Sequence, residues 1–279
     1  MVVIRAENSQ YEIDHTLGSL LMVDDTQARR NKQLIRAEYD SLPPAFLDNA
    51  KDKTIDIIPW DIALLWAYDL NWTPRPVIQS YSAYTPMLDS INAQHFKDSK
   101  APDNIIYSYK SIPGRYPLFD EPMVFRTLLE NYDVQTVDDY LILQHRLEKI
   151  TRHYTPVNQG VCPVGTVVDV PQLPGQHIYC NIDIRQNFFG KLINILYKPG
   201  YIYIRFFVKG QSEPIEYRFI RRLGTDGLFV SKYVADLTDI CSVFEESYEQ
   251  DIEKLQIVIP HNLFYKPDMK YEFYATPIL

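Results

Sequence analysis

The order of helix-like and strand-like segments is the feature that most limits what this chain can fold into. From residue 53 to residue 143, short apolar segments rich in β-branched residues alternate with segments of helical spacing. Such alternation is typical of a mainly parallel sheet covered by helices. After residue 154, short strand-like segments separated by turn signals dominate, which favours a β-sandwich. We therefore predict a Rossmann-like α/β domain over residues 1–154 and a jelly-roll-like β-sandwich domain over residues 155–279.

Local signals define the individual elements. Thr85 before Pro86 indicates a helix start, because threonine caps the first turn and proline suits the first helical position. In the first half we expect helices at 26–39, 61–70, 86–96 and 121–131, and strands at 54–58, 76–79, 104–107, 134–137 and 140–143. In the second half we expect one helical turn at 237–246 and strands at 164–170, 175–183, 191–197, 201–208, 216–221, 227–233, 256–260 and 271–276. The proline-bounded stretch 156–163 reads as the junction between the halves.

The composition of the chain and the absence of several motifs argue against some classes of partner, cofactor and metal site. The net charge of −8 and the pI of about 5.3 disfavour nucleic acid as a partner, because an acidic surface repels phosphate backbones. No glycine-rich phosphate loop and no Gly-x-Ser-x-Gly elbow is present. The histidines lack the spacing of a zinc helix, and the cysteines form no Cys-x-x-Cys pair. We therefore expect neither a cofactor nor a metal. Cys162 and Cys180 flank a loop and could form a disulfide, although unpaired thiols are the favoured alternative.

Polar and aromatic side chains gather after two of the predicted strands, where ligands bind in open α/β sheets. The sequence also places a second polar segment, 114–122, at the same rim. Aromatic faces flanked by polar groups suit a sugar, whose C–H faces stack while its hydroxyls form hydrogen bonds. The candidate ligand-binding residues are Trp60, Asp61, Arg75, Gln79, Tyr81, Tyr84, Arg115, Asp120 and Glu121. An equally weighted alternative is that Arg75 and Arg115 pair with Asp56 or Asp120 and hold the loops in place.

The carboxylates in this group leave two further interpretations open. Two carboxylates about 5–10 Å apart could act as acid and base on a glycoside. Asp61 and Glu121, however, stand where helix N-terminal residues belong, and a capping role is the favoured interpretation. The alternative function is therefore a carbohydrate-active enzyme, either a glycoside hydrolase or a glycosyltransferase domain, that uses Asp61, Asp120 or Glu121.

Several blocks of the chain resemble an uncharacterised bacterial family. They are residues 54–86, which contain Pro59-Trp60-Asp61, residues 101–107 (Ala-Pro-Asp-Asn-Ile-Ile-Tyr), residues 114–122 (Gly-Arg-Tyr-Pro-Leu-Phe-Asp-Glu-Pro) and residues 227–233 (Gly-Leu-Phe-Val-Ser-Lys-Tyr). The resemblance covers most of the chain beyond about residue 35. In that family the region is similar to the soluble C-terminal tail of polytopic membrane proteins, some of which are similar to lipid-linked-sugar glycosyltransferases of the cell envelope. No catalytic residues carry over from it.

The resemblance implies a location and a set of partners. It places the chain at the extracytoplasmic face of the cell envelope, beside the membrane-embedded portion of the same protein, with a glycan or lipid-linked sugar as ligand. The residues alone indicate otherwise: no stretch approaches the roughly 20 apolar residues of a membrane helix, and the N-terminus lacks the pattern of a signal peptide, which predicts a cytoplasmic stand-alone chain. The leading expectation is a non-catalytic accessory or recognition domain.

Overall fold

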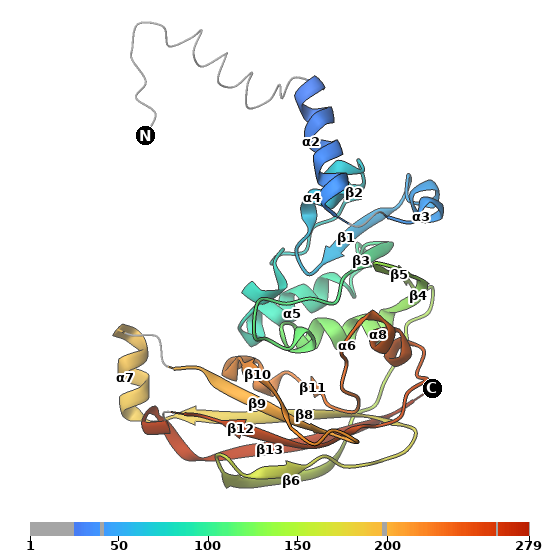
Figure 1. Ribbon diagram of the computed structural model, residues 1–279. Coiled ribbons are helices and arrows are strands. Elements are labelled where there is room, and N and C mark those ends of the chain that lie inside the picture. The colour runs from blue at the N-terminus through green and yellow to red at the C-terminus, as the bar shows by residue number, and fades with distance from the viewer. Residues whose placement is uncertain (1–24, 40–41, 197–199, 261, 279) are drawn as a thin grey trace, which may run out of the picture.

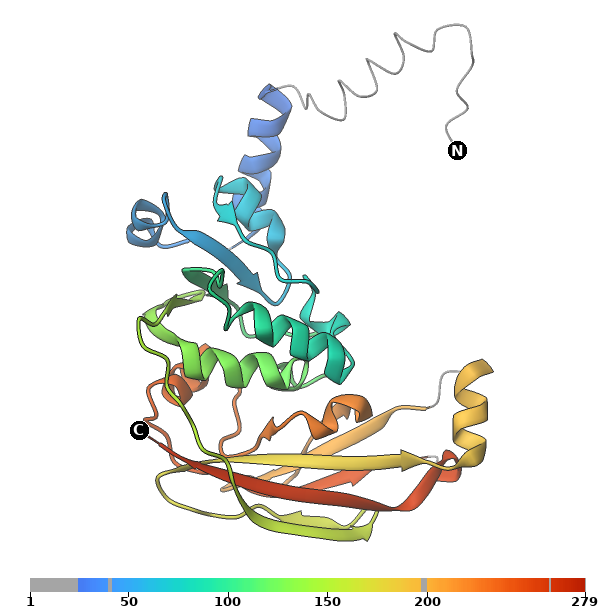
Figure 2. The ribbon, with the colours of Figure 1, turned by 180° about the vertical axis from the view of Figure 1, so that it is seen from behind.

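The computed structural model describes residues 25–39, 42–196, 200–260 and 262–278 (Figure 1). A mixed sheet stands above two antiparallel sheets, and the helices α5 (Pro86–His95) and α6 (Pro122–Asn131) lie between these layers. The view from behind shows the same order of layers (Figure 2). The protein is therefore a mixed α/β structure, as its segment order predicts.

The five-stranded sheet is mixed rather than mainly parallel. Its order is β2-β1-β3-β5-β4, where the strands are β1 (Thr54–Ile58), β2 (Asn71–Trp72), β3 (Asn104–Tyr107), β4 (Tyr132–Val137) and β5 (Leu141–His145). β1 pairs in parallel with β2 and β3, whereas β5 pairs antiparallel with both β3 and β4. The connection 138–140 is too short for a crossover, so β4 and β5 have to form an antiparallel hairpin.

Helices cover both faces of this sheet. α4 (Ile62–Ala67) and α3 (Pro44–Asn49) pack on its outer face, where a small core contains Ile55, Ile57 and Ile106, and α2 (Asp25–Glu38) contacts α4. α5 and α6 cover the inner face. The Thr85 hydroxyl accepts a hydrogen bond from the Leu88 amide at 3.3 Å, so the predicted cap of α5 is confirmed.

The predicted strand at 76–79 is wrong. The neighbour of β1 is β2, and residues 76–79 form bends that lead into the 3₁₀ helix Ser80–Ser82. Pro74 and Pro76 supply no N–H groups to a ladder. Side chains form hydrogen bonds with backbone groups of this segment instead. The Asn92 amide bonds the Val77 N–H and carbonyl, and the Arg75 guanidinium donates to the Ile78 carbonyl.

The second half contains two four-stranded antiparallel sheets with hydrophobic core residues between them. One sheet has the order β10-β9-β12-β7 and the other β11-β8-β13-β6. Buried and half-buried residues alternate strictly along β9, as expected for a strand with one face in a core. The strands are β6 (Thr155–Pro163), β7 (Val167–Asp169), β8 (Gln176–Gln186), β9 (Ile202–Val208), β10 (Ile215–Phe219), β11 (Leu228–Phe229), β12 (Ile252–Val258) and β13 (Tyr265–Pro277).

Two expectations for this half are corrected. The predicted strand at 191–197 falls mostly on the helix α7 (Phe188–Leu196), whose start is favoured because the Asn187 side chain accepts a hydrogen bond from the Gly190 amide at 2.8 Å. The predicted junction 156–163 lies within β6, which pairs with β13 at the edge of its sheet. An edge strand tolerates the missing amides of Pro156 and Pro163. The expected helical turn at 237–246 is confirmed as α8 (Leu237–Phe244).

One hydrophobic core joins the two halves. It contains residues of β3 and α6 together with residues of β8, β9, β12 and β13. Tyr116 packs against Phe206, with ring centroids 5.1 Å apart, and its hydroxyl accepts a hydrogen bond from the Val234 amide at 2.9 Å. The Tyr109 hydroxyl donates to the Val234 carbonyl at 2.6 Å. These contacts hold the loops after β3 against the second half.

Two further features bear on the expectations above. Cys162 and Cys180 are both free thiols, in β6 and β8. None of the helices within the described ranges combines the length and the apolar character that crossing a membrane requires.

Candidate functional site

Arg75 lies inside the protein rather than at a ligand-accessible rim. Its side chain is fully buried and forms an ion pair with Asp56 of β1 at 3.1 Å. The same guanidinium donates hydrogen bonds to the carbonyls of Ile57 at 2.6 Å and Pro59 at 2.7 Å. Asp56 also accepts from the Trp72 indole at 3.0 Å. Arg75 therefore fixes the end of β1 against the loop that follows β2, which is the loop-holding alternative considered above.

The three candidate carboxylates are buried and already engaged. Asp61 pairs with Lys110, Asp120 pairs with Arg115 at 3.1 Å, and Glu121 accepts a hydrogen bond from Asn92. Asp61 and Glu121 are the N-cap residues of α4 and α6, so their expected positions at helix starts are confirmed, but neither side chain accepts a capping hydrogen bond from its helix. Their carboxylates instead face other elements: Asp61 pairs with Lys110, whereas Glu121 accepts from Asn92 of α5 and lies 4.0 Å from the Arg75 guanidinium.

Burial raises the pKa of two of these carboxyl groups. It raises the pKa of Asp120, although the Ser111 hydroxyl and the Arg115 guanidinium oppose the shift. Burial also raises the pKa of Glu121, and there Arg75 opposes it. Both effects stem from the removal of water around a carboxylate, and neither requires a substrate.

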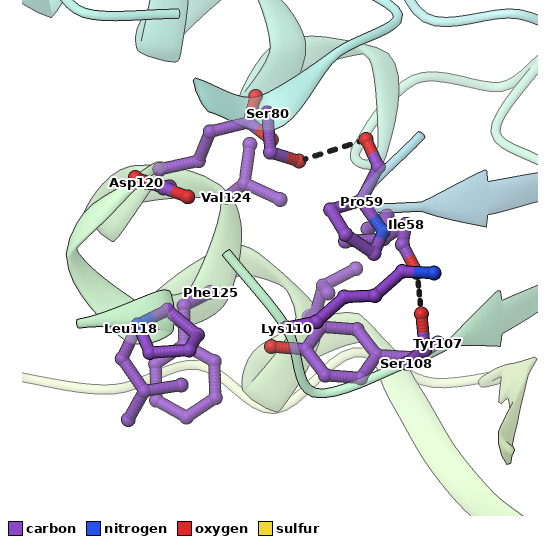
Figure 3. A pocket seen from close by; sticks show the side chains of 13 residues that line it. Ile58, Pro59, Ser80, Tyr107, Ser108, Lys110, Leu118, Asp120, Val124 and Phe125 are labelled. Carbon is purple, nitrogen blue, oxygen red and sulfur yellow. Dashed lines mark hydrogen bonds between the residues drawn. The ribbon is translucent and has the colours of Figure 1, made fainter. Parts of the chain in front are cut away.

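Asp120 and Glu121 line a small cavity beside the end of β1 (Figure 3). Asp120 and Leu118 lie on one side of it, and Ile58, Pro59 and Ser108 lie on the other. The cavity measures about 20 Å³, which is room for about one water molecule. A sugar ring does not fit there, so Asp120 and Glu121 do not face an open cleft.

A larger groove lies where the loops of the α/β half meet strands of the two antiparallel sheets. Its volume is about 730 Å³, within the range typical of ligand sites. Four tyrosines and four arginines line it, and among the described residues no carboxylate does. We call it the tyrosine–arginine groove and define it by Tyr81, Tyr84, Arg115, Tyr201, Arg218, Arg221, Arg222 and Tyr265.

Backbone contacts bring the two sides of this groove together. The Arg218 amide on β10 donates to the Gly114 carbonyl at 2.6 Å, and Arg115 and Arg218 form an isolated parallel bridge. Gly114 has a φ of +81°, a left-handed conformation that glycine adopts without steric penalty. The Arg115 guanidinium also donates to the Tyr81 carbonyl at 2.9 Å. Segments near residues 81, 115 and 218 thus meet at one place.

The charges on the arginines of the groove are unequally compensated. Arg115 is neutralised by Asp120. Arg218 instead lies over the Tyr201 ring, 4.3 Å from its centroid, and Arg221 donates to the Ile184 carbonyl at 3.0 Å. Partial burial lowers the pKa of Arg221, with a smaller contribution from Arg222. Among the carboxylates of the described residues, none forms an ion pair with Arg218, Arg221 or Arg222.

The residues expected from the sequence therefore divide into separate places. Tyr81, Tyr84 and Arg115 line the groove, whereas Asp120 and Glu121 line the small cavity. Arg75 and Asp61 are buried in ion pairs.

Trp60 and Gln79 line neither space. The Trp60 ring packs edge-on against Tyr81 with centroids 5.4 Å apart, so it supports one wall of the groove from behind. Gln79 is exposed at the residue before the 3₁₀ helix Ser80–Ser82.

Sequence reasoning missed the groove residues of the second half. Tyr201, Arg218, Arg221, Arg222 and Tyr265 all come from segments that were expected only to fill strands and turns. The adjacent pair Arg221-Arg222 in an acidic chain was an available signal, but it carried no information about its neighbours.

Comparison with protein-family models, with curated proteins and with solved structures gives no match for this chain. Within the described residues, no group of three or more His, Cys, Asp or Glu side chains is arranged to hold a metal ion.

Proposed function

We propose that this chain is a non-catalytic recognition module that binds a glycan in the tyrosine–arginine groove. The observation that carries the proposal is the lining of that groove. Tyrosine rings offer flat apolar faces with a polar tip, and guanidinium groups offer several N–H donors in a fixed plane. Sugars need both, because their C–H faces stack on rings while their hydroxyls accept and donate hydrogen bonds.

The exposure of the tyrosines supports this use of the groove. Tyr84 and Tyr201 are each 51% exposed, although each ring offers a large apolar surface. Exposed aromatic rings that border a polar hollow commonly mark binding sites. Tyr81 is half-buried on the Trp60 ring and is therefore held in place before a ligand arrives. Such preorganisation reduces the conformational entropy lost on binding.

The cellular context remains part of the proposal and rests on the family resemblance. In this proposal the module acts at the extracytoplasmic face of the cell envelope as an accessory to a membrane-embedded portion, and its ligand is a glycan or a lipid-linked sugar. We also propose that the α/β half is Rossmann-like and that the β half is a jelly-roll-like sandwich. This proposal is supported by the helices on both faces of the mixed sheet and by the two facing antiparallel sheets.

The alternative of a carbohydrate-active enzyme receives no support from Asp61, Asp120 and Glu121. Each is buried beside a cation or an amide donor, and the cavity at Asp120 and Glu121 holds about one water. A glycoside hydrolase requires two carboxylates on opposite sides of an accessible sugar. These three carboxylates therefore do not meet that requirement.

A glycan array followed by calorimetric titration of the bound glycans tests the proposal. We expect the wild-type protein to bind at least one glycan, and Tyr81→Ala and Tyr84→Ala to weaken that binding about tenfold or more, since a buried aromatic contact contributes about 1–3 kcal/mol. Trp66→Ala is the matched control. Trp66 is an aromatic residue of α4 that is 45% exposed and lies outside the groove.

Circular dichroism and thermal melts establish that each variant is folded. The proposal is wrong if the wild-type protein binds no glycan, or if both tyrosine variants are folded and bind as tightly as the wild type. Equal loss of binding in the Trp66→Ala control would also contradict it.

A further inference from the structure

We infer that the ligand of the tyrosine–arginine groove carries an anionic group, and that Arg218, Arg221 and Arg222 form the subsite that holds it. This inference rests on the proposed function and adds a charge requirement to it. The chemistry named here is an oxyanion with several acceptor oxygens, either a phosphate or a carboxylate attached to the glycan.

The charge of the groove is opposite to that of the chain. The whole protein carries a net charge of −8, yet the described residues that line the groove include four arginines and no Asp or Glu. Arg115 does not count toward an anion site, because Asp120 already compensates its charge. Three positive charges therefore remain to be matched. Arginines gathered without a carboxylate repel one another, and a bound anion removes that repulsion.

Two carboxylates that interact electrostatically with these arginines are engaged elsewhere. Asp183 acts on the charge of Arg221, but it forms its own ion pair with Arg185 at 2.7 Å. Asp120 likewise feels the charge of Arg218 while it pairs with Arg115 and bonds the Ser111 hydroxyl. Neither acid is left as a dedicated partner for the three arginines.

Two of the three arginines are also held at fixed positions by neighbouring elements. Arg218 belongs to β10 and stacks over Tyr201, while Arg221 begins the 3₁₀ helix Arg221–Thr225 and is held by the Ile184 carbonyl of β8. Arg222 follows directly and is exposed. A guanidinium fork matches the geometry of phosphate and carboxylate oxygens, so it binds them with paired, charge-assisted hydrogen bonds.

Paired glycans provide the probes for this inference. Each glycan that the wild-type protein binds is compared as its neutral form, its phosphorylated form and its uronic acid form, and inorganic phosphate and acetate are titrated separately as competitors. We expect one anionic form to bind at least tenfold more tightly than the neutral form, which corresponds to about 1.4 kcal/mol. Which anionic form binds better identifies the group.

Two arginine variants locate the subsite. In Arg218→Gln/Arg222→Gln we expect the preference for the anionic form to fall to about twofold or less. The single variant Arg222→Gln changes only an exposed side chain, so it tests the subsite even if the double variant does not fold. It should lose part of the preference for the anionic form. Lys270→Gln is the control: it removes one positive charge from an exposed residue of β13 that does not line the groove, and it should keep the full preference.

The possible results separate the inference from the proposed function. If neutral and anionic forms bind equally well in a Tyr81-dependent manner, the anionic subsite is refuted and the glycan module stands. If inorganic phosphate binds in an Arg222-dependent manner while no glycan binds, the anion subsite stands and the glycan function is refuted. If neither glycans nor phosphate bind, both are refuted. Salt gives an additional readout, because 0.5 M NaCl should weaken only the anionic binding.

Discussion

We expect Arg75→Met to destabilise the α/β half strongly without acting through a ligand. Methionine fills part of the space but donates no hydrogen bond. The substitution leaves Asp56 buried without its counterion and removes the hydrogen bonds to the carbonyls of Ile57, Pro59 and Ile78. Removing one partner of a buried ion pair typically costs about 3–5 kcal/mol, a large part of the stability of an ordinary domain.

The assay follows urea unfolding by tryptophan fluorescence. The three tryptophans, Trp60, Trp66 and Trp72, all lie in the first half, and the Trp72 indole contacts Asp56 directly, so the signal reports on the affected region. A double-mutant cycle with Asp56→Asn tests the mechanism. Because the second substitution removes the unpaired buried charge, Arg75→Met/Asp56→Asn should be less destabilised than the sum of the two single variants, by about 0.5–3 kcal/mol.

Two results would refute this reasoning. One is an Arg75→Met protein that loses less than about 1 kcal/mol of stability, since the buried charge of Asp56 would then not matter. The other is additive single and double variants, which would mean that Arg75 and Asp56 do not stabilise each other. If Arg75→Met loses glycan binding while its stability is unchanged, Arg75 contacts the ligand as the sequence suggested.

Two further predictions concern stability. Burial raises the pKa of Asp89 from 3.8 to about 8, the charges of Glu121 and Asp226 add to the shift, and the Met123 and Val124 amides that donate to its carboxylate oppose it; because the folded-state pKa is raised, stability should fall as the pH rises from about 4 to about 8, by at most about 1.4 kcal/mol per pH unit. Asp89→Asn should flatten that slope in urea titrations at several pH values, and an unchanged slope would contradict the assignment. Gly224→Ala should destabilise the protein by about 1–3 kcal/mol in thermal melts, since a Cβ there would lie 2.4 Å from the Ile182 carbonyl oxygen. Gly200→Ala, which meets no atom within 4 Å, is its matched control and should change stability by less than about 0.5 kcal/mol.

Most elements of the fold could be predicted because their signals are local. β1 is a run of apolar, largely β-branched residues, and the start of α5 shows threonine followed by proline. The failures have physical reasons as well. The β-branched content of residues 193–195 favoured a strand, whereas the Asn187 side chain begins a helix there. At β6, the prolines indicated a linker. That prediction failed because prolines are tolerated in an edge strand, and a sequence does not show which strand will lie at the edge of a sheet.

The candidate site was predicted only in part. Tyr81, Tyr84 and Arg115 were singled out by their residue type near strand ends, and they line the groove. Arg75 has the same residue type and a similar position, yet its side chain turns inward to Asp56. Residue type and spacing state what a side chain can bind, and they do not state which of several partners it meets first.

What the sequence alone determined is the class of the protein: an α/β half, a β half, and no motif for a cofactor or a metal. These follow from periodicity, from the placement of glycine and proline, and from charge, all of which act over a few residues. Only the tertiary structure decided that Tyr81, Arg115 and Arg218 meet in one groove and that Arg75 and Asp120 serve buried ion pairs. The reason is that these contacts depend on how the two halves pack through the shared core around Tyr116 and Phe206, and such long-range packing leaves no periodic trace in the chain.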